Sequence, residues 1–269
     1  LRDAALRLAQ GDLSFRIARS GQDEIGQVAD AFNGMAQEVQ NMLEEQTAFA
    51  RNTSHELRTP LTALRLRTEA LRYDPLDAET ARRYIEEVDE EIVHLSNLVG
   101  DVTILSRFDA GRAELGQDEI DLGRLAAVLS TQLEPLAHAR QVELTLAGCD
   151  QPLLVHAGLS HLSVVLRNLL DNALKYTPAG GKVVCTLGQR DGAVEVDIQD
   201  TGQGIAAEDL PHIFERFYRA DKAHSDEIPG AGLGLALVKS IVDAYGAQIR
   251  VVSAGVGRGT AVTLLWPAA

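Results

Sequence analysis

Apolar side chains recur at alternating steps of four and three residues through the first part of the chain. The first series comprises Val28, Phe32, Met35, Val39, Met42, Gln46, Phe49 and Thr53, with Gln46 and Thr53 as polar members. This spacing is typical of a coiled-coil seam on a long helix. The steps stay at four through Leu57 and Leu61, and the mixed spacing resumes from Leu64. Such a stutter locally unwinds a supercoil.

A second helix with the same periodicity begins near Asp77, a suitable N-cap residue. Its seam comprises Ala81, Ile85, Val88, Ile92, Leu95, Val99 and Val102. The connection YDPLDAET is short, so we expect the two helices to form an antiparallel hairpin. One hairpin cannot bury both seams. Two hairpins paired as a dimer would form a four-helix bundle.

From about residue 121 the pattern changes to short β-rich runs separated by helical segments and glycine-bearing connections. The runs are VELTLAG, KVVCTL, AVEVDIQD, QIRVVS and TAVTLLW. They predict an α+β domain or a two-layer α/β domain. The polar stretch DAGRAELGQDEI before it has the composition of a linker.

The composition excludes several classes of protein. The 269-residue chain has a formal net charge of −14, which argues against nucleic-acid binding because phosphate contacts need a clustered basic face. Cys149 and Cys185 lie far apart in sequence and predict two inert thiols in a reducing compartment. No run is apolar enough to cross a bilayer. The chain begins at Leu1 within an apparent helix, so we expect a fragment whose upstream part could include a membrane segment.

The segment FARNTSHELRTPL places His55 on the first long helix, about 200° away from the seam. His55 should therefore point outward, and a solvated surface histidine is the alternative to a reactive one. Glu56 can orient the imidazole for nucleophilic attack near neutral pH. Pro60 costs on the order of 3 kcal/mol in a helix interior and would allow a bend. A zinc motif is excluded because Thr59 stands where H-E-x-x-H needs histidine.

The segment LRNLLDNALKYTP places Asn168, Asn172 and Lys175 on one polar stripe of a helix. Amide oxygens suit Mg²⁺, and a lysine one turn further suits a phosphate. For these residues alone, a helix with a solvated face is an equally good explanation. The opposite, apolar stripe comprises Leu162, Leu166, Leu169 and Ala173.

Three further glycine-bearing segments follow. DTGQGI comes directly after a β-rich run; its Asp200 can accept a hydrogen bond from an exocyclic amine, and Gly202 and Gly204 permit close backbone approach. GAGLGLAL exposes backbone N–H groups at the start of a helix, where anions bind. GRGT, ending at Thr260, precedes the last strand, where an ordinary hairpin turn is the alternative. The residues between the first two segments are numerous enough for a mobile lid.

Together these motifs resemble the cytoplasmic part of a bacterial two-component sensor histidine kinase, along the whole chain. TSHELRTPLT resembles the H-box, RNLLDNALKY the N-box, DTGQG and GAGLGLAL the two G-boxes, and FERFYR the F-box. LRLAQGDLSFRI with GQDEIGQVADAFNGMA resembles a HAMP linker that lacks the start of its first helix. The second G-box departs from the family at Pro229-Gly230-Ala231, which removes a hydroxyl and stiffens the hinge of the lid.

The resemblance implies a helical hairpin that forms a dimeric four-helix bundle, followed by an α/β two-layer sandwich of the GHKL type shared with gyrase and the Hsp90 chaperones. The implied domains are a partial HAMP linker at 1–41, a dimerisation and histidine phosphotransfer domain at 42–110, a linker at 111–120 and an ATP-binding domain at 121–269.

The resemblance also assigns site residues. Asn168 and Asn172 would hold Mg²⁺, and Lys175 would face the phosphates of ATP. Asp200 would bond the adenine amine, and Tyr176 would pack near the base. The remaining implied nucleotide-binding residues are Gly202, Gly204, Phe217, Gly230, Gly232, Gly234, Leu235 and Thr260.

The implied activity is autophosphorylation of His55 by ATP and transfer of the phosphoryl group to an aspartate of a response regulator. Glu56 would act as base or orienter, and Thr59 would position the water of a phosphatase reaction. The implied partners are a second copy of the chain and a cognate receiver domain, without nucleic acid, and the implied location is the cytoplasmic side of the inner membrane. Input from the HAMP helices would change the helix register or tilt near residues 42–60, with Pro60 supplying the bend.

Three alternative functions compete with histidine kinase activity. A non-catalytic ATP-binding scaffold would lack His55 or both asparagines, and all three residues are present. A chaperone or topoisomerase ATPase would lack the hairpin at 42–108. Phosphatase activity that dominates over kinase activity in the fragment is the third alternative.

Overall fold

The computed structural model describes residues 2–18, 24–149, 151–220 and 230–269. It forms two compact units, Leu1–Val88 and Asp89–Ala269, and each is described by itself. Within the described parts of the chain, no helix combines the length and the apolar character that a membrane crossing requires.

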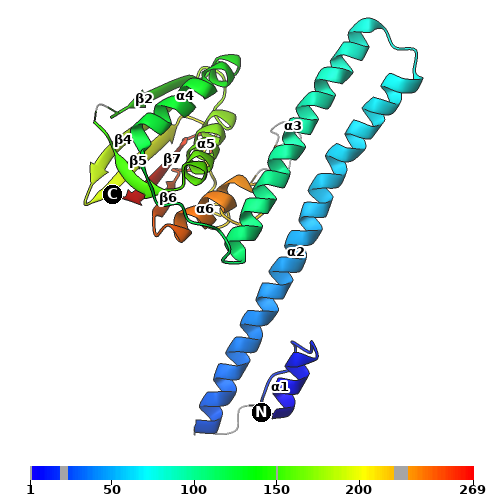
Figure 1. The fold of residues 1–269 in the computed structure, drawn as a ribbon, viewed down its shortest axis with the longest axis vertical. Helices are drawn as coiled ribbons and strands as arrows, with labels where there is room; N and C mark the ends of the chain where they lie inside the picture. Colours follow the sequence, from blue (N-terminus) through cyan, green and yellow to red (C-terminus); the bar gives the residue numbers. More distant parts are fainter. Residues whose placement is uncertain (1, 19–23, 150, 221–229) are drawn as a thin grey trace. The chain divides into compact units, whose positions relative to one another are not determined.

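The N-terminal unit is helical, as expected. It contains α1 (Arg2–Ala9), α2 (Glu24–Tyr73) and the start of α3 (Ala78–Asp109) (Figure 1). The extended segment after α1 is fastened to α2 because the Asn33 side chain donates to the Ile17 carbonyl oxygen at 3.0 Å and accepts from the Ile17 N–H at 2.8 Å. Because the Asn33 side chain pairs with both backbone groups of Ile17, the segment is fixed in position against α2.

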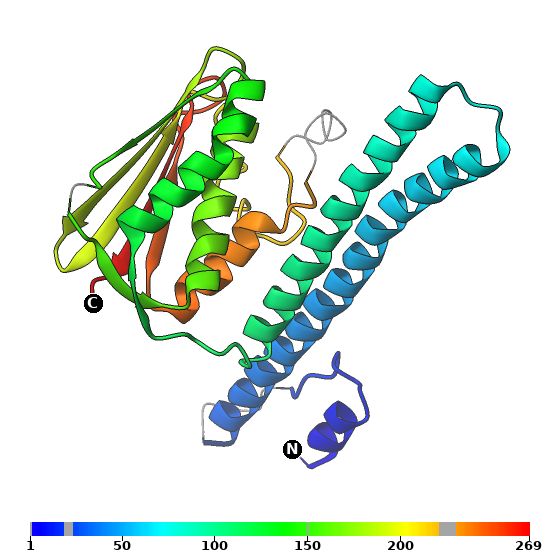
Figure 2. The same ribbon diagram turned by 45° about the horizontal axis from the view of Figure 1, so that its top comes forward.

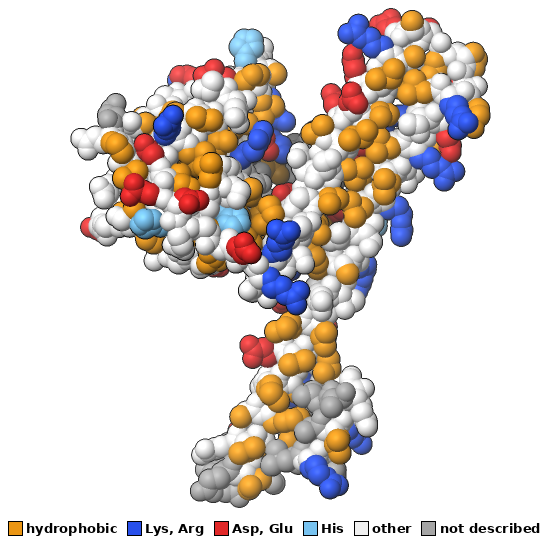
Figure 3. All heavy atoms as spheres, viewed as in Figure 1, with side chains coloured by type: hydrophobic (Ala, Val, Ile, Leu, Met, Phe, Trp, Pro, Cys, Tyr) orange, Lys and Arg blue, Asp and Glu red, His pale blue; other side chains and the backbone are white. Residues whose placement is uncertain are grey.

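Helix α3 begins one residue after Asp77, whose carboxylate accepts from the Thr80 N–H at 2.7 Å. The expected N-cap is therefore confirmed. Several seam residues remain exposed in the single chain, with Ile85 at 54%, Ile92 at 49% and Val99 at 51%. Apolar side chains line the visible surface of the long helices (Figure 3). Stripes of this kind are normally covered by another helix.

The C-terminal unit contains a five-stranded sheet in the order β2-β4-β5-β7-β6. Its strands are β2 (Glu143–Ala147), β4 (Lys182–Arg190), β5 (Ala193–Asp200), β6 (Gln248–Val252) and β7 (Thr260–Pro267). Only the pairing of β2 with β4 is parallel. The five β-rich runs of the sequence are all confirmed as strands.

A second sheet pairs β1 (Asp118–Asp121) with β3 (Leu154–Ala157), and the sequence did not predict it. β1 begins inside the segment expected to be a linker. It leads into helix α4 (Leu122–Ala139), because the Asp121 carboxylate caps that helix through the Gly123 and Arg124 N–H groups. The same carboxylate also accepts from the Leu153 N–H, which ties the start of α4 to β3.

Helices α4, α5 (Leu159–Lys175) and α6 (Gly234–Ala244) cover one face of the five-stranded sheet, giving the expected two-layer α/β sandwich (Figure 2). Side chains alternate along the strands, and the buried ones meet the helices. The core includes Leu162, Leu166, Leu169, Ala173, Val183, Val196, Ile198, Leu237, Ile241, Leu264 and Trp266. The expected apolar stripe of α5 is thus confirmed. Burial in this core raises the pKa of the Cys185 thiol to about 12, as expected for an inert cysteine.

Candidate functional site

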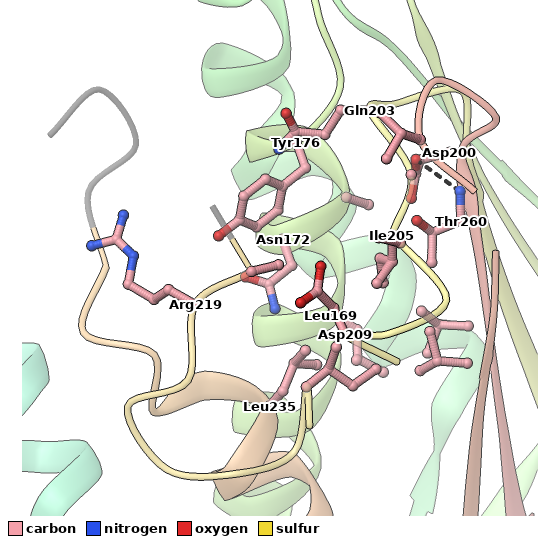
Figure 4. Close-up of a pocket in the computed structure, with 18 of the residues that line it drawn as sticks. Leu169, Asn172, Tyr176, Asp200, Gln203, Ile205, Asp209, Arg219, Leu235 and Thr260 are labelled. Atoms are coloured by element: carbon pink, nitrogen blue, oxygen red, sulfur yellow. Dashed lines mark hydrogen bonds between the residues drawn. The ribbon is translucent and has the colours of Figure 1, made fainter. Parts of the chain in front are cut away.

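A cavity of about 340 Å³ opens between helix α5, the ends of strands β5 and β7, and the segment after β5 (Figure 4). This volume suits a small organic ligand. The walls are mainly apolar, with a few polar groups at defined positions. Six of the residues expected at a nucleotide site line it, namely Asn172, Tyr176, Asp200, Gly204, Leu235 and Thr260.

Asp200, the last residue of β5, is the most constrained polar group of the cavity. Its Oδ1 atom accepts from the N–H groups of Gly202 at 2.8 Å and Thr260 at 3.2 Å. Burial raises the pKa of the carboxyl, and these two backbone bonds act in the opposite direction. Because both bonds use Oδ1, the second oxygen is available to a ligand that carries a hydrogen-bond donor.

The polar stripe of α5 faces the same region. Asn172 lines the cavity, whereas Asn168 lies one turn earlier. The Asn168 side-chain nitrogen donates to the Val164 carbonyl oxygen at 2.9 Å, and this bond fixes the direction of the amide oxygen Oδ1. Two amide oxygens one turn apart form a donor set that suits a hard cation such as Mg²⁺. The Lys175 ammonium pairs instead with Asp171 at 2.6 Å.

Helix α6 begins beside this stripe. A Cβ atom on Gly234 would overlap Asn168 Oδ1, so the first turn of α6 packs directly on the side chain of α5. Leu235 reaches the cavity wall. The N-terminal N–H groups of a helix carry partial positive charge and favour an anion. The second glycine-rich segment therefore brings an anion-binding helix end next to the asparagine stripe.

Gly232 contacts the backbone of the FERFYR segment. Its φ of +69° is a left-handed conformation, and an added Cβ would lie 2.8 Å from both the Phe217 carbonyl carbon and the Tyr218 carbonyl oxygen. The Gly232 carbonyl oxygen accepts from the Phe217 N–H at 2.9 Å. Phe217 itself adopts a φ of +62°, which is unusual for an aromatic residue.

The cavity residues that were not expected at the site include two charged residues and a tyrosine. Asp209, Tyr218 and Arg219 all line the cavity. The Arg219 guanidinium donates to the Gly230 carbonyl oxygen at 2.9 Å and lies at the end of the cavity away from Asp200 (Figure 4). Of the FERFYR motif, only Phe217 was expected at the nucleotide site. The last residue of the motif, Arg219, could have indicated a cation at this site.

Some expected residues lie outside the cavity lining. Gly202 supplies its N–H to Asp200, and Gly232 and Gly234 act through the contacts described above. Gly230 accepts the Arg219 bond through its carbonyl oxygen, and Phe217 is held by Gly232. The expected lid includes residues 221–229, and Pro229 of the second G-box is among them; these lie outside the described residues.

His55 belongs to the N-terminal unit and is exposed on α2, as the seam predicted. Thr59 is also exposed, Glu56 is half-buried and Pro60 is buried. Helix α2 runs without interruption from Glu24 to Tyr73, so the proline lies inside a continuous helix. An exposed imidazole with an adjacent carboxylate is accessible to a phosphoryl donor and to a partner protein.

Three family models match successive parts of the chain. The HAMP domain matches residues 1–41, the His Kinase A (phospho-acceptor) domain matches 45–111, and the histidine kinase-, DNA gyrase B- and HSP90-like ATPase matches 158–269. His55 lies in the second match, and Asn168, Asn172 and Asp200 lie in the third.

Curated relatives and solved structures agree with these matches. Sensor histidine kinase YkoH of Bacillus subtilis is 34% identical over 95% of this chain and 56% of its own length. The histidine-protein kinase/phosphatase MprB of Mycobacterium leprae is 35% identical over 99% of this chain and 52% of its own length. The chain thus spans about half the length of these relatives.

Two solved structures share the fold. The histidine kinase AdeS of Acinetobacter baumannii is 25% identical with a TM-score of 0.62, covering 79% of this chain and 97% of its own. Full-length ShkA in complex with AMPPNP is 31% identical with a TM-score of 0.62, covering 83% of this chain and 46% of its own. The three domain matches in this order, together with these relatives, show that the chain belongs to the two-component sensor histidine kinases.

Proposed function

We propose that this chain binds ATP in the cavity beside Asp200, transfers the γ-phosphoryl group to His55, and passes it to an aspartate of a response regulator. The observation that carries the proposal is the Asp200 carboxylate, oriented by two backbone N–H groups at the end of an apolar cavity. The similarity to ShkA, which was solved with AMPPNP, supports ATP as the nucleotide.

Asp200 recognises the base in this proposal. Its oxygen Oδ2 accepts a hydrogen bond from the exocyclic amine of adenine, and the apolar walls contact the ring faces. Tyr176, 39% exposed at the mouth of the cavity, covers the base from the side of α5. A guanine base presents a carbonyl oxygen where adenine has its amine, so this carboxylate selects adenine.

The triphosphate lies toward the N-terminus of α6 and Arg219. Asn168 and Asn172 are the proposed ligands of Mg²⁺, which neutralises phosphate charge when bound. Arg219 and the first N–H groups of α6 bind phosphate oxygens. Lys175 joins them only if its ammonium leaves Asp171, with which it pairs at 2.6 Å. Lys175 therefore reaches a phosphate only when this ion pair breaks.

His55 is the proposed nucleophile. A neutral imidazole nitrogen attacks the γ-phosphorus in line, the bond from phosphorus to the β,γ-bridging oxygen breaks, and ADP leaves. Glu56 orients the ring and accepts the proton that the imidazolium loses. The phosphohistidine then gives its phosphoryl group to a carboxylate oxygen of the regulator.

Thr59 is the proposed anchor of a water molecule that hydrolyses the phosphorylated regulator. It is exposed one helical turn after His55 on α2. The MprB relatives carry both kinase and phosphatase in their names, which supports a second, opposing activity. The balance between the two activities is the property that an upstream signal would control.

The domain boundaries proposed are 1–41 for the partial HAMP linker, 42–110 for phosphotransfer, 111–120 for the linker and 121–269 for ATP binding. The family-model matches support the first, second and fourth of these. The exposed seam of α3 supports a homodimer closed as a four-helix bundle. The HAMP match supports attachment to an inner-membrane sensor, with this chain on the cytoplasmic side.

The test is phosphorylation of the purified chain with γ-labelled ATP and Mg²⁺. Alkali-stable, acid-labile label that passes to a receiver domain supports the proposal. Tight ATP binding without any label would favour the alternative, a non-catalytic ATP-binding scaffold. Release of phosphate from a pre-phosphorylated receiver domain, lost on Thr59→Ala, tests the phosphatase activity separately.

A further inference from the structure

The described segment after β5, residues 201–220, contains a side-chain hydrogen bond that joins two of its turns. Its backbone advances through consecutive turns, in which His212 N–H donates to the Asp209 carbonyl oxygen at 2.8 Å and Glu215 N–H donates to that of His212 at 2.8 Å. Tyr218 N–H then donates to the Glu215 carbonyl oxygen at 3.3 Å. The turns return the chain to the cavity, so that Asp209 and Tyr218 both line it.

The side chains of these two residues join the first turn to the last. The Tyr218 hydroxyl donates to Asp209 Oδ1 at 2.6 Å. This bond to the Asp209 carboxylate, followed by burial and nearby acidic charges, raises the pKa of Tyr218 to about 12. A hydrogen bond to an ionised acceptor is about twice as strong as one between neutral groups. The hydroxyl is therefore engaged with Asp209 rather than available to a ligand.

Gly232 contacts the backbone of residues 217 and 218. The Gly232 carbonyl oxygen accepts from the Phe217 N–H, and the close packing at Tyr218 leaves no room for a side chain at position 232. Residues 217 and 218 are thus fixed from two directions, by the start of α6 and by Asp209. Arg219 is the next residue along the chain.

Arg219, which directly follows Tyr218, brings a positive charge to the cavity. It lines the cavity, its guanidinium bonds to the Gly230 carbonyl oxygen, and it lies away from Asp200 (Figure 4). We propose that Asp209 and Tyr218 form a positioning pair, which holds Arg219 toward the phosphates and so sets the affinity for phosphate-bearing nucleotides without contributing to adenosine binding. This inference rests on the proposed function, because it assumes that the cavity takes ATP.

Tyr218→Phe tests the pair, because it removes only the hydroxyl and keeps the ring that lines the cavity. The matched control is Tyr245→Phe. That hydroxyl also bonds within the same unit, to Gly158 N–H at 3.0 Å and His161 Nδ1 at 2.8 Å, but Tyr245 does not line the cavity. Dissociation constants for ATP and for adenosine are measured by calorimetry on the full chain in Mg²⁺, alongside nucleotide-free thermal unfolding.

We expect Tyr218→Phe to raise the Kd for ATP about tenfold and to leave the Kd for adenosine within about twofold. Arg219→Ala should reproduce this split, and Tyr245→Phe should leave both constants unchanged. Asp209→Asn keeps an acceptor for the hydroxyl and should raise the Kd for ATP less than Tyr218→Phe does.

Two outcomes would overturn the positioning role. One is an unchanged Kd for ATP in Tyr218→Phe, and the other is an equal loss of ATP and adenosine binding, which would mean a damaged cavity. The wild-type chain reports on the proposed function separately. Wild-type ATP binding with either outcome contradicts the positioning pair alone, whereas a wild-type chain that does not bind ATP contradicts both proposals.

Discussion

The backbone of Gly234 lies against the side-chain oxygen of Asn168, so closely that a Cβ atom at position 234 would overlap it. The contact joins the first turn of α6 to the polar stripe of α5. It explains why the second glycine-rich segment and the asparagine stripe, 66 residues apart in sequence, form one site. A larger residue at position 234 would displace the Asn168 amide oxygen, which is a proposed ligand of Mg²⁺.

Gly234→Ala should therefore weaken the binding of Mg²⁺-ATP and also lower the stability of the fold. The new methyl group displaces the Asn168 amide, whose nitrogen is fixed on Val164. We expect the Kd for Mg²⁺-ATP to rise at least tenfold and the free energy of unfolding to fall by about 1–3 kcal/mol. Calorimetry with and without Mg²⁺, together with urea unfolding, measures both.

The matched control for that substitution is Gly188→Ala, a glycine of β4 around which a Cβ would meet nothing within 4 Å. It should leave nucleotide affinity unchanged. Equal affinity in the Gly234→Ala chain and in the control would show that the contact does not serve the nucleotide site.

Asp200 gives a pH dependence of defined sign. Burial raises its pKa, so the folded chain binds this proton more tightly than the unfolded chain does. The stability that the group contributes is therefore present at low pH and is lost as the pH rises through the folded pKa. Nucleotide affinity has the opposite pH dependence and falls at low pH. A protonated Oδ2 presents a donor to the adenine amine, which itself needs an acceptor.

Affinity for adenosine should thus begin to fall, on acidification, at a higher pH than an exposed aspartate with a pKa of about 3.9 would give. Asp200→Asn should weaken adenosine binding about tenfold or more at neutral pH and remove this part of the pH dependence. Asp197→Asn is the control, since Asp197 lies on β5 and bonds Gln199 and Thr263 rather than the cavity. A wild-type pH profile in Asp200→Asn would contradict the assignment.

The exposed apolar seam of α3 predicts a dimer. A single charged substitution in the seam should disrupt that dimer. Ile92 is 49% exposed in the single chain and belongs to the seam. Burying an unpaired carboxylate in a bundle core is strongly unfavourable, so Ile92→Glu should shift the chain to monomer at micromolar concentration. Light scattering after size-exclusion chromatography measures the mass. A monomeric wild-type chain at that concentration would contradict the four-helix bundle.

Pro60 is buried inside the continuous helix α2, five residues after His55. Pro60→Ala restores a backbone hydrogen bond and should stiffen the helix at the stutter. We expect the ratio of autophosphorylation rate to regulator dephosphorylation rate to change severalfold, with unchanged ATP affinity. An unchanged ratio would show that bending at the proline does not control the two activities.

The periodic parts of the fold were predictable. Short β-rich runs predicted all five strands of the main sheet, and the seams predicted α2 and α3. The pair β1 and β3 was missed because strands of four residues carry too little periodicity to separate them from loops. The pairing order of the sheet depends on contacts distant in sequence, which local patterns do not encode.

Residues within the sequence motifs of the candidate site were predictable, whereas cavity residues in the turns after β5 were mostly not. Asp200, Asn172 and Leu235 line the cavity as expected. Lys175 was assigned to phosphate from its spacing on α5, but spacing could not reveal that Asp171, one turn earlier, holds its ammonium. Arg219 and Asp209 were missed because they reach the cavity through the turns after β5, and these turns have no repeating pattern.

The most direct test of the account compares four chains for incorporation of label from γ-labelled ATP in Mg²⁺. They are the wild type, His55→Gln, Asn172→Ala and the control His138→Gln, an exposed histidine at the end of α4. We expect acid-labile label in the wild type and the control, and none in the other two chains. Label that persists in His55→Gln would contradict the account, because the phosphoryl group would then rest on a residue other than His55.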